Sequence, residues 1–323
     1  MNMKNIYGII IAILFLVSCN SNKQTGIPTV AFADAFEDNT ITQAKKGFFD
    51  ALKQKGFSDS AKTIKVLYRN AQGDIPALNQ IVKYFISEKV DLIGTNPSIA
   101  TTTAVQQTKT IPVFMMVSPT PDRMKLTDSK GAAPTNLYGV GETLDYIDTS
   151  FALIKQLIHP KGATLKVGML YNQSEPQSVD ALAHIKELAT QLGIEVKALS
   201  VSNSAEVQLV AQSLLTNNID VFFANPDNTV FASFETIVKS CNNAKVPIIS
   251  SEAGLVARGA VAAYGANMYQ WGFQAGEQAA IYLQTKSTKE IQWQKVSLHK
   301  HVYNAAAAKM FNISIPSTYE AIP

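Results

Sequence analysis

Residues 63–94 read TIKVLYRNAQGDIPALNQIVKYFISEKVDLIG and contain one complete strand–helix–strand unit. Residues 63–68 alternate as a strand does, and residues 90–94 form a second apolar strand. Between them, residues 75–88 place apolar side chains on one face of a helix, namely Ile75, Leu78, Ile81, Val82 and Phe85. Because each strand is followed by a covering helix, this unit predicts a parallel sheet with helices on its faces.

The same alternation extends outward along the chain in both directions. Residues 27–33 and 111–117 are further apolar strands, and residues 41–55 form an amphipathic helix with Gly56 at its end. The pattern then begins again. Its strands are expected at 165–171, 194–199, 219–224 and 246–250, with helices near 177–191, 205–216 and 229–243. The sequence therefore predicts an α/β protein with two doubly wound parallel-sheet lobes.

The segments outside these two halves are expected to join them. Residues 118–142 are rich in Pro, Gly, Asp, Thr and Ser, which indicates a loop and a crossing strand. A strand at 260–264, a helix at 271–285 and an extended segment at 293–302 are too short together for a third domain. We expect a hinged clamshell whose lobe 1 comprises residues 27–140 and about 252–288, and whose lobe 2 comprises residues 141–251 and about 289–323.

Composition bounds the class of protein. The chain has 323 residues, of which 46% are hydrophobic and 16% charged, so it can bury one large core or two ordinary ones. Its formal net charge is +3, and Lys and Arg are scattered along the sequence. This pattern argues against nucleic-acid binding and against a polybasic membrane patch, and it favours a neutral or zwitterionic small ligand.

The N-terminus carries a targeting signal. Lys4 precedes a ten-residue apolar run, 8–17, which is too short to span a bilayer as a stable helix, so residues 1–18 are predicted to be a signal peptide. The run ends in LVSC, which resembles a lipobox, so Cys19 is the predicted lipidation site. Residues 19–26 then form a polar tether. The alternative is an ordinary secretory signal with a chance cysteine. Lipidation would leave Cys241, in a predicted helix, without a disulfide partner.

Several stretches along the mature chain resemble one protein family in their residues and in their order. They are residues 47–52, 68–74, 91–100, 111–114, 118–123, 136–140, 167–172 with Glu175 and Ser178, 246–248, 259–260, 304–308 and 313–316. In this order they are similar to the ABC-transporter substrate-binding protein family that includes tryptophan- and tyrosine-binding lipoproteins.

The resemblance implies the type I periplasmic-binding fold and reversible capture of a small polar molecule, an amino acid or a related compound. It also implies permease and ATPase subunits as partners and needs no cofactor. We further expect a monomer held on the extracytoplasmic side of a bacterial membrane by its lipid. Family members with aromatic ligands often carry a His-Pro pair after the first strand, where this chain has FEDNT at 36–40, so the ligand is left open.

Candidate ligand-binding residues follow from the fold class. In doubly wound sheets, ligands lie beyond the carboxyl ends of the strands, where helix N-termini expose free N–H groups. The residues at these positions are Asp34, Phe36, Thr95, Asn96, Ser98 and Ser118 in the first half, Asn172, Ser174, Glu175, Asn225, Asp227, Ser251 and Glu252 in the second, and Tyr264 and Asn267 near a later crossing.

Particular roles can be assigned within this set. Asn96, Pro97 and Ser98 are expected to form a helix start whose amides could bind a carboxylate. Asp227 or Glu252 could pair with an ammonium, and Phe36 or Tyr264 could stack on a ring. The alternative is structural, because Asn, Asp and Ser at strand ends are the commonest turn and cap formers.

Catalytic interpretations find little support. The chain has no P-loop, no GxGxxG and no GxSxG motif. His299 and His301 could bind a metal as alternating strand residues, but no further ligand lies nearby in the sequence, and an exposed strand accounts for them. We therefore expect no catalytic residue and no metal. Three hypotheses remain: a transport receptor, a sensor or scaffold lipoprotein of the same fold, and a hydrolase or isomerase.

Overall fold

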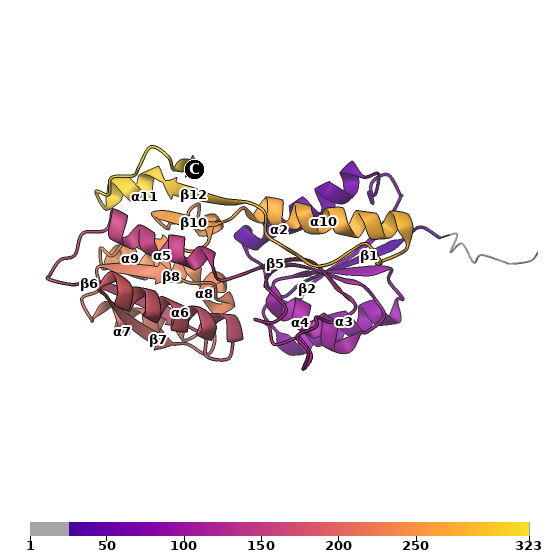
Figure 1. Ribbon diagram of the computed structural model, residues 1–323, viewed down its shortest axis with the longest axis horizontal. Coiled ribbons are helices and arrows are strands. Elements are labelled where there is room, and N and C mark those ends of the chain that lie inside the picture. Colours follow the sequence, from indigo (N-terminus) through magenta and orange to yellow (C-terminus); the bar gives the residue numbers. More distant parts are fainter. Residues whose placement is uncertain (1–25, 323) are drawn as a thin grey trace, which may run out of the picture.

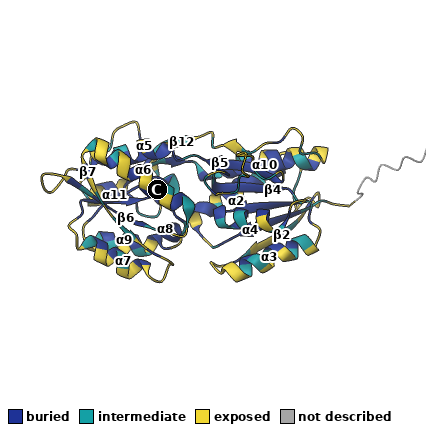
Figure 2. Cartoon of the chain, turned by 60° about the horizontal axis from the view of Figure 1, so that its bottom comes forward, coloured by how far each residue is buried: buried dark blue, intermediate teal, exposed yellow. Residues whose placement is uncertain are grey.

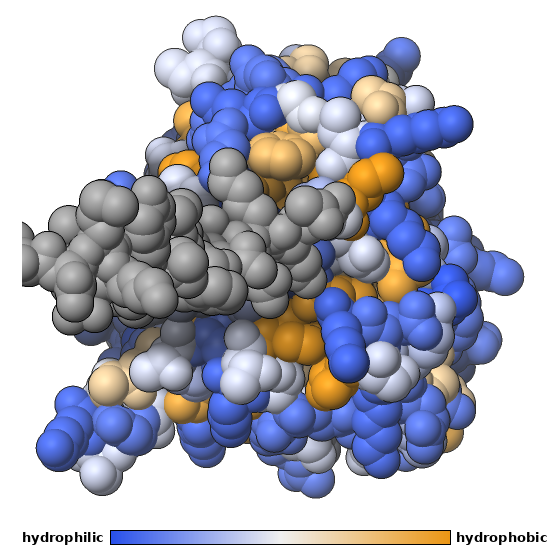
Figure 3. Space-filling view, turned by 90° about the vertical axis from the view of Figure 1, so that its right-hand side faces the viewer, coloured by the Kyte–Doolittle hydropathy of each residue, from blue (hydrophilic) through white to orange (hydrophobic). Residues whose placement is uncertain are grey.

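The computed structural model describes residues 26–322, which form two α/β lobes lying side by side (Figure 1). The predicted signal peptide at 1–18 and Cys19 lie outside the described residues. No helix of the described part is both long and apolar enough to cross a membrane. Seen from the end of the molecule where residue 26 enters, the surface is mainly hydrophilic, with separate apolar patches (Figure 3).

The first lobe is built on a six-stranded sheet in the order β11-β5-β4-β3-β1-β2, with every neighbouring pair parallel. Its strands are β1 (Thr29–Asp34), β2 (Lys65–Asn70), β3 (Leu92–Asn96), β4 (Val113–Pro119), β5 (Leu137–Glu142) and β11 (Gln294–Lys295). One face carries α2 (Asn39–Gln54) and α10 (Met268–Thr285), and the other carries α3 (Ile75–Ser87) and α4 (Ser98–Gln107) (Figure 1).

The second lobe is built on a seven-stranded sheet in the order β13-β12-β10-β9-β8-β6-β7. Its strands are β6 (Leu165–Tyr171), β7 (Ile194–Ser200), β8 (Val221–Ala224), β9 (Ile248–Ser250), β10 (Ala262–Ala266), β12 (His299–Asn304) and β13 (Glu320–Ile322). Its helices are α5 (Tyr146–Leu157), α6 (Pro176–Leu192), α7 (Val207–Leu215), α8 (Asn228–Ala232), α9 (Phe234–Asn243), α11 (Ala305–Met310) and the 3₁₀ turn η1 (Ala253–Leu255). Only the β10–β12 pair among these described strands is antiparallel.

The predicted fold class is confirmed, because both sheets are mostly parallel and covered by helices. The central strands of both sheets are buried between the helices, as their dark blue colour in Figure 2 shows, whereas the edge strands are more exposed. Cys241 lies in α9 and is fully buried. The helix expected at 229–243 is divided at Ser233 into α8 and α9.

The expected lobe boundary near residue 252 is wrong. Strand β10 pairs with β9 and β12 inside the second sheet, so residues 252–267 belong to the second lobe and not to the first. Strand β11 pairs with β5 and therefore belongs to the first lobe. An apolar run predicts a buried strand, but it does not say which sheet the strand joins. The exposed strand expected around His299 and His301 is β12, which lies between β10 and β13 with both histidines half-buried.

Three crossings connect the lobes. The first follows β5 and leads into α5, the second leads from β10 into α10, and the third leads from β11 into β12. Helix α10 is held firmly against α2 because Gly272 and Gly276 allow their backbones to approach. A Cβ atom on Gly272 would lie 1.7 Å from the Ala44 carbonyl oxygen. The second crossing therefore ends on a rigid element, which is what a hinge requires.

Candidate functional site

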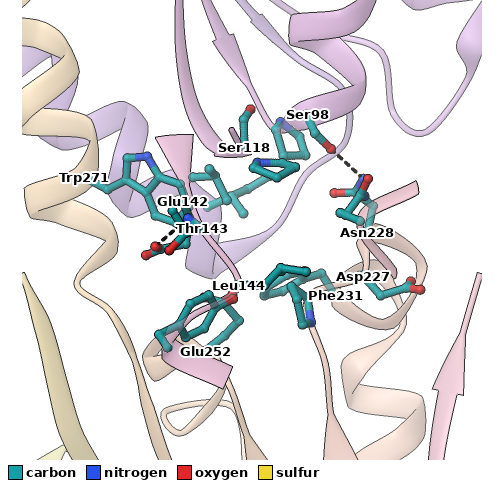
Figure 4. A pocket seen from close by; sticks show the side chains of 17 residues that line it. Ser98, Ser118, Glu142, Thr143, Leu144, Asp227, Asn228, Phe231, Glu252 and Trp271 are labelled. Atoms are coloured by element: carbon teal, nitrogen blue, oxygen red, sulfur yellow. Dashed lines mark hydrogen bonds between the residues drawn. The ribbon is translucent and has the colours of Figure 1, made fainter. Parts of the chain in front are cut away.

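A cavity of about 40 Å³ lies between the two lobes, beside the first two crossings (Figure 4). It is lined by Ile41, Pro97, Ser98, Val117, Ser118, Pro119, Glu142, Thr143, Leu144, Tyr146, Gln177, Pro226, Asp227, Asn228, Phe231, Glu252 and Trp271. A volume of this size holds a few water molecules. A larger molecule therefore enters only when the lobes move apart.

The wall from the first lobe offers hydrogen-bond donors. Helix α4 begins at Ser98, and the backbone amides of Ser98 and Ile99 donate no hydrogen bond within the described residues. Ser118, at the end of β4, is buried beside this helix, and its hydroxyl lies 3.1 Å from Thr101 Oγ1. Free amides at a helix start, with a hydroxyl close by, favour an anionic group.

The opposite wall contains a buried glutamate with one unpartnered oxygen. Glu252 is only 4% exposed, and its Oε1 accepts a hydrogen bond of 2.8 Å from the Tyr146 hydroxyl. Its Oε2 has no hydrogen-bond partner within residues 26–322. Burial, and to a lesser degree the nearby Glu142 carboxylate, raises the pKa of Glu252 to about 8, although the Tyr146 bond opposes this shift. A positively charged donor bound at Oε2 would supply the missing hydrogen bond and favour the ionised carboxylate.

Glu142 supplies a second carboxylate at the same end. Its Oε1 accepts from the Thr143 amide at 2.8 Å, and its Oε2 lies 2.6 Å from His299 Nε2. Burial, followed by the charge of Glu252, raises the pKa of Tyr146 well above its ordinary value, so this hydroxyl stays a donor. We refer to Glu142, Glu252 and Tyr146 as the acidic end of the cavity.

Two further carboxylates, those of Asp227 and Glu175, lie near α8. Asp227 accepts from the Asn172 amide at 2.7 Å and from the Ser178 hydroxyl at 2.5 Å. Glu175 Oε2 accepts from the Asn228 amide and side chain at 3.0 and 2.9 Å. Burial, and then the Asp227 charge, raises the pKa of Glu175, and burial also raises that of Asp227.

Asn228 connects this group to the other lobe. Its side-chain nitrogen also lies 3.1 Å from Ser98 Oγ, and this hydrogen bond crosses the cleft (Figure 4).

Aromatic side chains complete the lining. Trp271, at the start of α10, donates its indole N–H to the Val140 carbonyl at 2.8 Å, which fixes the plane of its ring. Phe231 and Tyr146 line the cavity from the second lobe, and no lysine, arginine or histidine lines it. The cavity thus combines donors on one wall, carboxylates on the other and aromatic rings between them.

Sequence comparison identifies the family. A profile of the ABC transporter substrate binding protein family matches residues 29–321. The chain belongs to this family. A relative from Clostridioides difficile called tyrosine-binding protein is 34% identical over 275 residues, which cover 84% of this chain and 78% of that protein.

Solved structures agree with this family membership. A conserved domain protein from Vibrio cholerae has a TM-score of 0.83 at 28% identity, covering 91% of this chain and 99% of that one. A ligand-free, open substrate-binding protein with adhesive properties from Clostridium difficile has a TM-score of 0.67 at 27% identity, covering 92% and 99%. The ABC domain from Streptococcus pneumoniae in complex with L-Trp has a TM-score of 0.81 at 23% identity, covering 91% and 99%, and shows the shared fold.

In this substrate-binding protein, four of the residues expected to bind ligand line the cavity: Ser98, Ser118, Asp227 and Glu252. Asn172 and Glu175 support the lining residues Asp227 and Asn228 by hydrogen bonds. These six residues come from both lobes, so the rule that ligands lie at strand carboxyl ends located the cleft.

The other expected residues have structural surroundings instead. In the first lobe, Asp34 bonds Lys45, Tyr68 and Asn96; Thr95 lies 2.9 Å from Thr101; and Phe36 packs against the core. In the second lobe, Asn225 bonds Ser178, Ser251 bonds the Ala224 carbonyl, Ser174 is in a turn with Asn172, Tyr264 stacks on His299, and Asn267 caps α10.

The helix expected to start at Asn96–Ser98 begins at Ser98, with Pro97 at the cap position instead of Asn96. The Asn96 side-chain amide donates to Asp34 Oδ1 and to the Ile41 carbonyl and does not cap the helix.

Several lining residues were missed by the sequence analysis, chiefly Glu142, Tyr146, Phe231 and Trp271. Glu142 and Tyr146 flank the first crossing, and Trp271 follows the second. Where a chain is expected to cross between lobes, polar and aromatic residues next to the crossings are candidates for the cavity lining. Within residues 26–322, no group of three or more His, Cys, Asp or Glu side chains could hold a metal ion.

Proposed function

We propose that this protein captures a zwitterionic amino acid with an aromatic side chain between its lobes and presents it to an ABC importer. The observation that carries this proposal is the buried, unpartnered Oε2 atom of Glu252. A buried carboxylate oxygen without a donor is costly, and an ammonium group supplies both a donor and the opposite charge. Glu142, at the same end, is a second acceptor for that group.

The α-carboxylate has a matching partner on the other wall. The free amides at the start of α4 and the Ser118 hydroxyl would bind it, and the positive end of the helix dipole favours its charge. An amino acid that reaches both walls contacts both lobes at once. Such a ligand favours closure, because these contacts are complete only in the closed form.

The side chain would lie among Trp271, Phe231 and Tyr146. Aromatic rings bury large apolar areas and stack favourably on one another, so tyrosine or tryptophan suits this lining better than a sugar or a small aliphatic amino acid. The name of the 34%-identical relative, tyrosine-binding protein, supports this choice. Because the cavity is small in this conformation, we expect its aromatic walls to separate around a bound ring.

Anchoring and partners complete the proposal. Lipid attached at Cys19 would hold the receptor at the extracytoplasmic side of the membrane, near a permease and its ATPase, and would raise its concentration there. The protein would act as a monomer, without a cofactor, and release its ligand chemically unchanged.

Isothermal titration of a soluble protein beginning after Cys19 tests the proposal. L-tyrosine and L-tryptophan should bind with one site, and E252Q should weaken both by about tenfold or more because it removes the charge that meets the ammonium. Glu187 is an exposed glutamate on α6 of the same lobe, so E187Q is the matched control. Tight binding of a sugar or nucleoside, with no binding of either amino acid, would refute the proposal.

A further inference from the structure

His299 lies directly behind the acidic end of the cavity without lining it. It is the first residue of β12 and follows the third crossing, whereas Glu142 is the last residue of β5 and precedes the first crossing. The two side chains meet at 2.6 Å, so their hydrogen bond joins two of the three crossings. A carboxylate only accepts hydrogen bonds, so His299 Nε2 carries the proton.

The imidazole also stacks against two tyrosine rings. Tyr146 stacks on it with ring centroids 5.7 Å apart and planes inclined by 28°. Tyr264 stacks at the same distance of 5.7 Å, with an inclination of 22°. The Tyr146 hydroxyl in turn donates to Glu252 Oε1. His299 therefore reaches Glu142 directly and Glu252 through Tyr146.

We propose that His299 is a positioning residue for the ammonium site. It fixes Glu142 and Tyr146 so that the carboxylates of Glu142 and Glu252 face one donor group. This role rests on the proposed function, because it concerns the same site. Both Glu142 oxygens already accept one bond each, from Thr143 and His299, and each retains acceptor capacity for an ammonium.

The location at the crossings adds a consequence for binding order. Elements next to a hinge move little relative to each other when the lobes separate. The His299–Glu142 bond can therefore persist in the open form. The acidic end is then in place before closure brings the amides at the start of α4 to the ligand. The ammonium end of the ligand would bind first and the carboxylate end on closure.

The test compares two probes that differ only in the amino group, L-tryptophan and indole-3-propionate. H299L removes the donor to Glu142, so it should weaken L-tryptophan by about tenfold or more and indole-3-propionate by less than about twofold. H299Q keeps a side-chain N–H donor and should restore most of the affinity for L-tryptophan. H301Q is the matched control, because His301 also packs against Tyr264, with ring centroids 4.6 Å apart and planes tilted by 42°, but bonds neither glutamate.

The possible outcomes separate this inference from the proposed function. If wild-type protein binds neither L-tryptophan nor L-tyrosine, the proposed ligand fails and the role of His299 fails with it. If wild-type protein binds L-tryptophan but H299L weakens both probes equally, or neither, only the positioning role is overturned. Unfolding midpoints of all variants establish that they fold.

Discussion

Asp38 and Arg258 form a buried ion pair between the lobes, and its removal should favour the open form. Asp38 precedes α2 in the first lobe, and Arg258 follows η1 in the second. Their side chains are 1% and 9% exposed, so solvent screens the pair poorly. The same guanidinium bonds Glu235 and the Phe231 carbonyl within its own lobe.

The D38N variant isolates the charge across the cleft. Asp38 caps α2 through Oδ1, which accepts from the amides of Thr40 and Ile41, and asparagine caps helices equally well. Breaking a fully buried charge pair costs about 2–5 kcal/mol. Because Arg258 keeps Glu235 as a partner, we expect a smaller value of about 1–2 kcal/mol, or a roughly 5- to 30-fold lower ratio of closed to open protein.

Small-angle scattering of the ligand-stripped protein measures this ratio through the radius of gyration. D38N should be larger than wild type, and it should release L-tryptophan faster. Two controls share parts of the interaction. E235Q alters the same guanidinium within one lobe, and D180N removes an exposed cross-lobe pair with Arg123, which should matter little. If D38N scatters like wild type and both controls, the pair does not hold the lobes together.

Three further predictions concern the cavity and the scaffold. Burial raises the pKa of Glu252 from 4.5 to about 8, so ligand-free wild type should lose stability as pH rises through this range, and E252Q should not. If the difference in melting temperature between wild type and E252Q stays constant from about pH 5 to about pH 9, this prediction is wrong. G272A should lower the melting temperature strongly, because its Cβ would clash with the Ala44 carbonyl. The control G162A should change it little, because no atom lies within 4 Å of an added Cβ there. Similar effects of the two variants would argue against close α2–α10 packing. W271F loses the bond to Val140 and should weaken L-tryptophan binding several-fold by titration, and unchanged affinity would remove Trp271 from the site.

Sequence periodicity located most of the fold because apolar runs and amphipathic faces are local properties. It could not assign residues 252–267 to a sheet, since strand neighbours are set by contacts distant in sequence: β10 pairs with β9 and with β12, more than thirty residues further on. The same limit applies to the site. Ser98, Ser118, Asp227 and Glu252 followed from strand ends, whereas Glu142 and Trp271 depend on how the crossings meet.

Polar residues at strand ends illustrate a second limit. Asp34 and Asp227 are both buried aspartates at such positions, yet Asp34 is paired with Lys45 inside the first lobe and Asp227 lines the cavity. Their positions in the sequence do not distinguish them, because the difference depends on which side chain of a neighbouring helix, such as Lys45 of α2, lies against each carboxylate.

The most direct test of the account is a crystal structure of the protein with L-tryptophan. We predict that the ligand ammonium lies within hydrogen-bond distance of Glu252 Oε2, and that its carboxylate meets the amides at the start of α4. The indole ring should lie beside Trp271 and Phe231. A ligand bound in the reverse direction, or outside this cavity, would contradict the account.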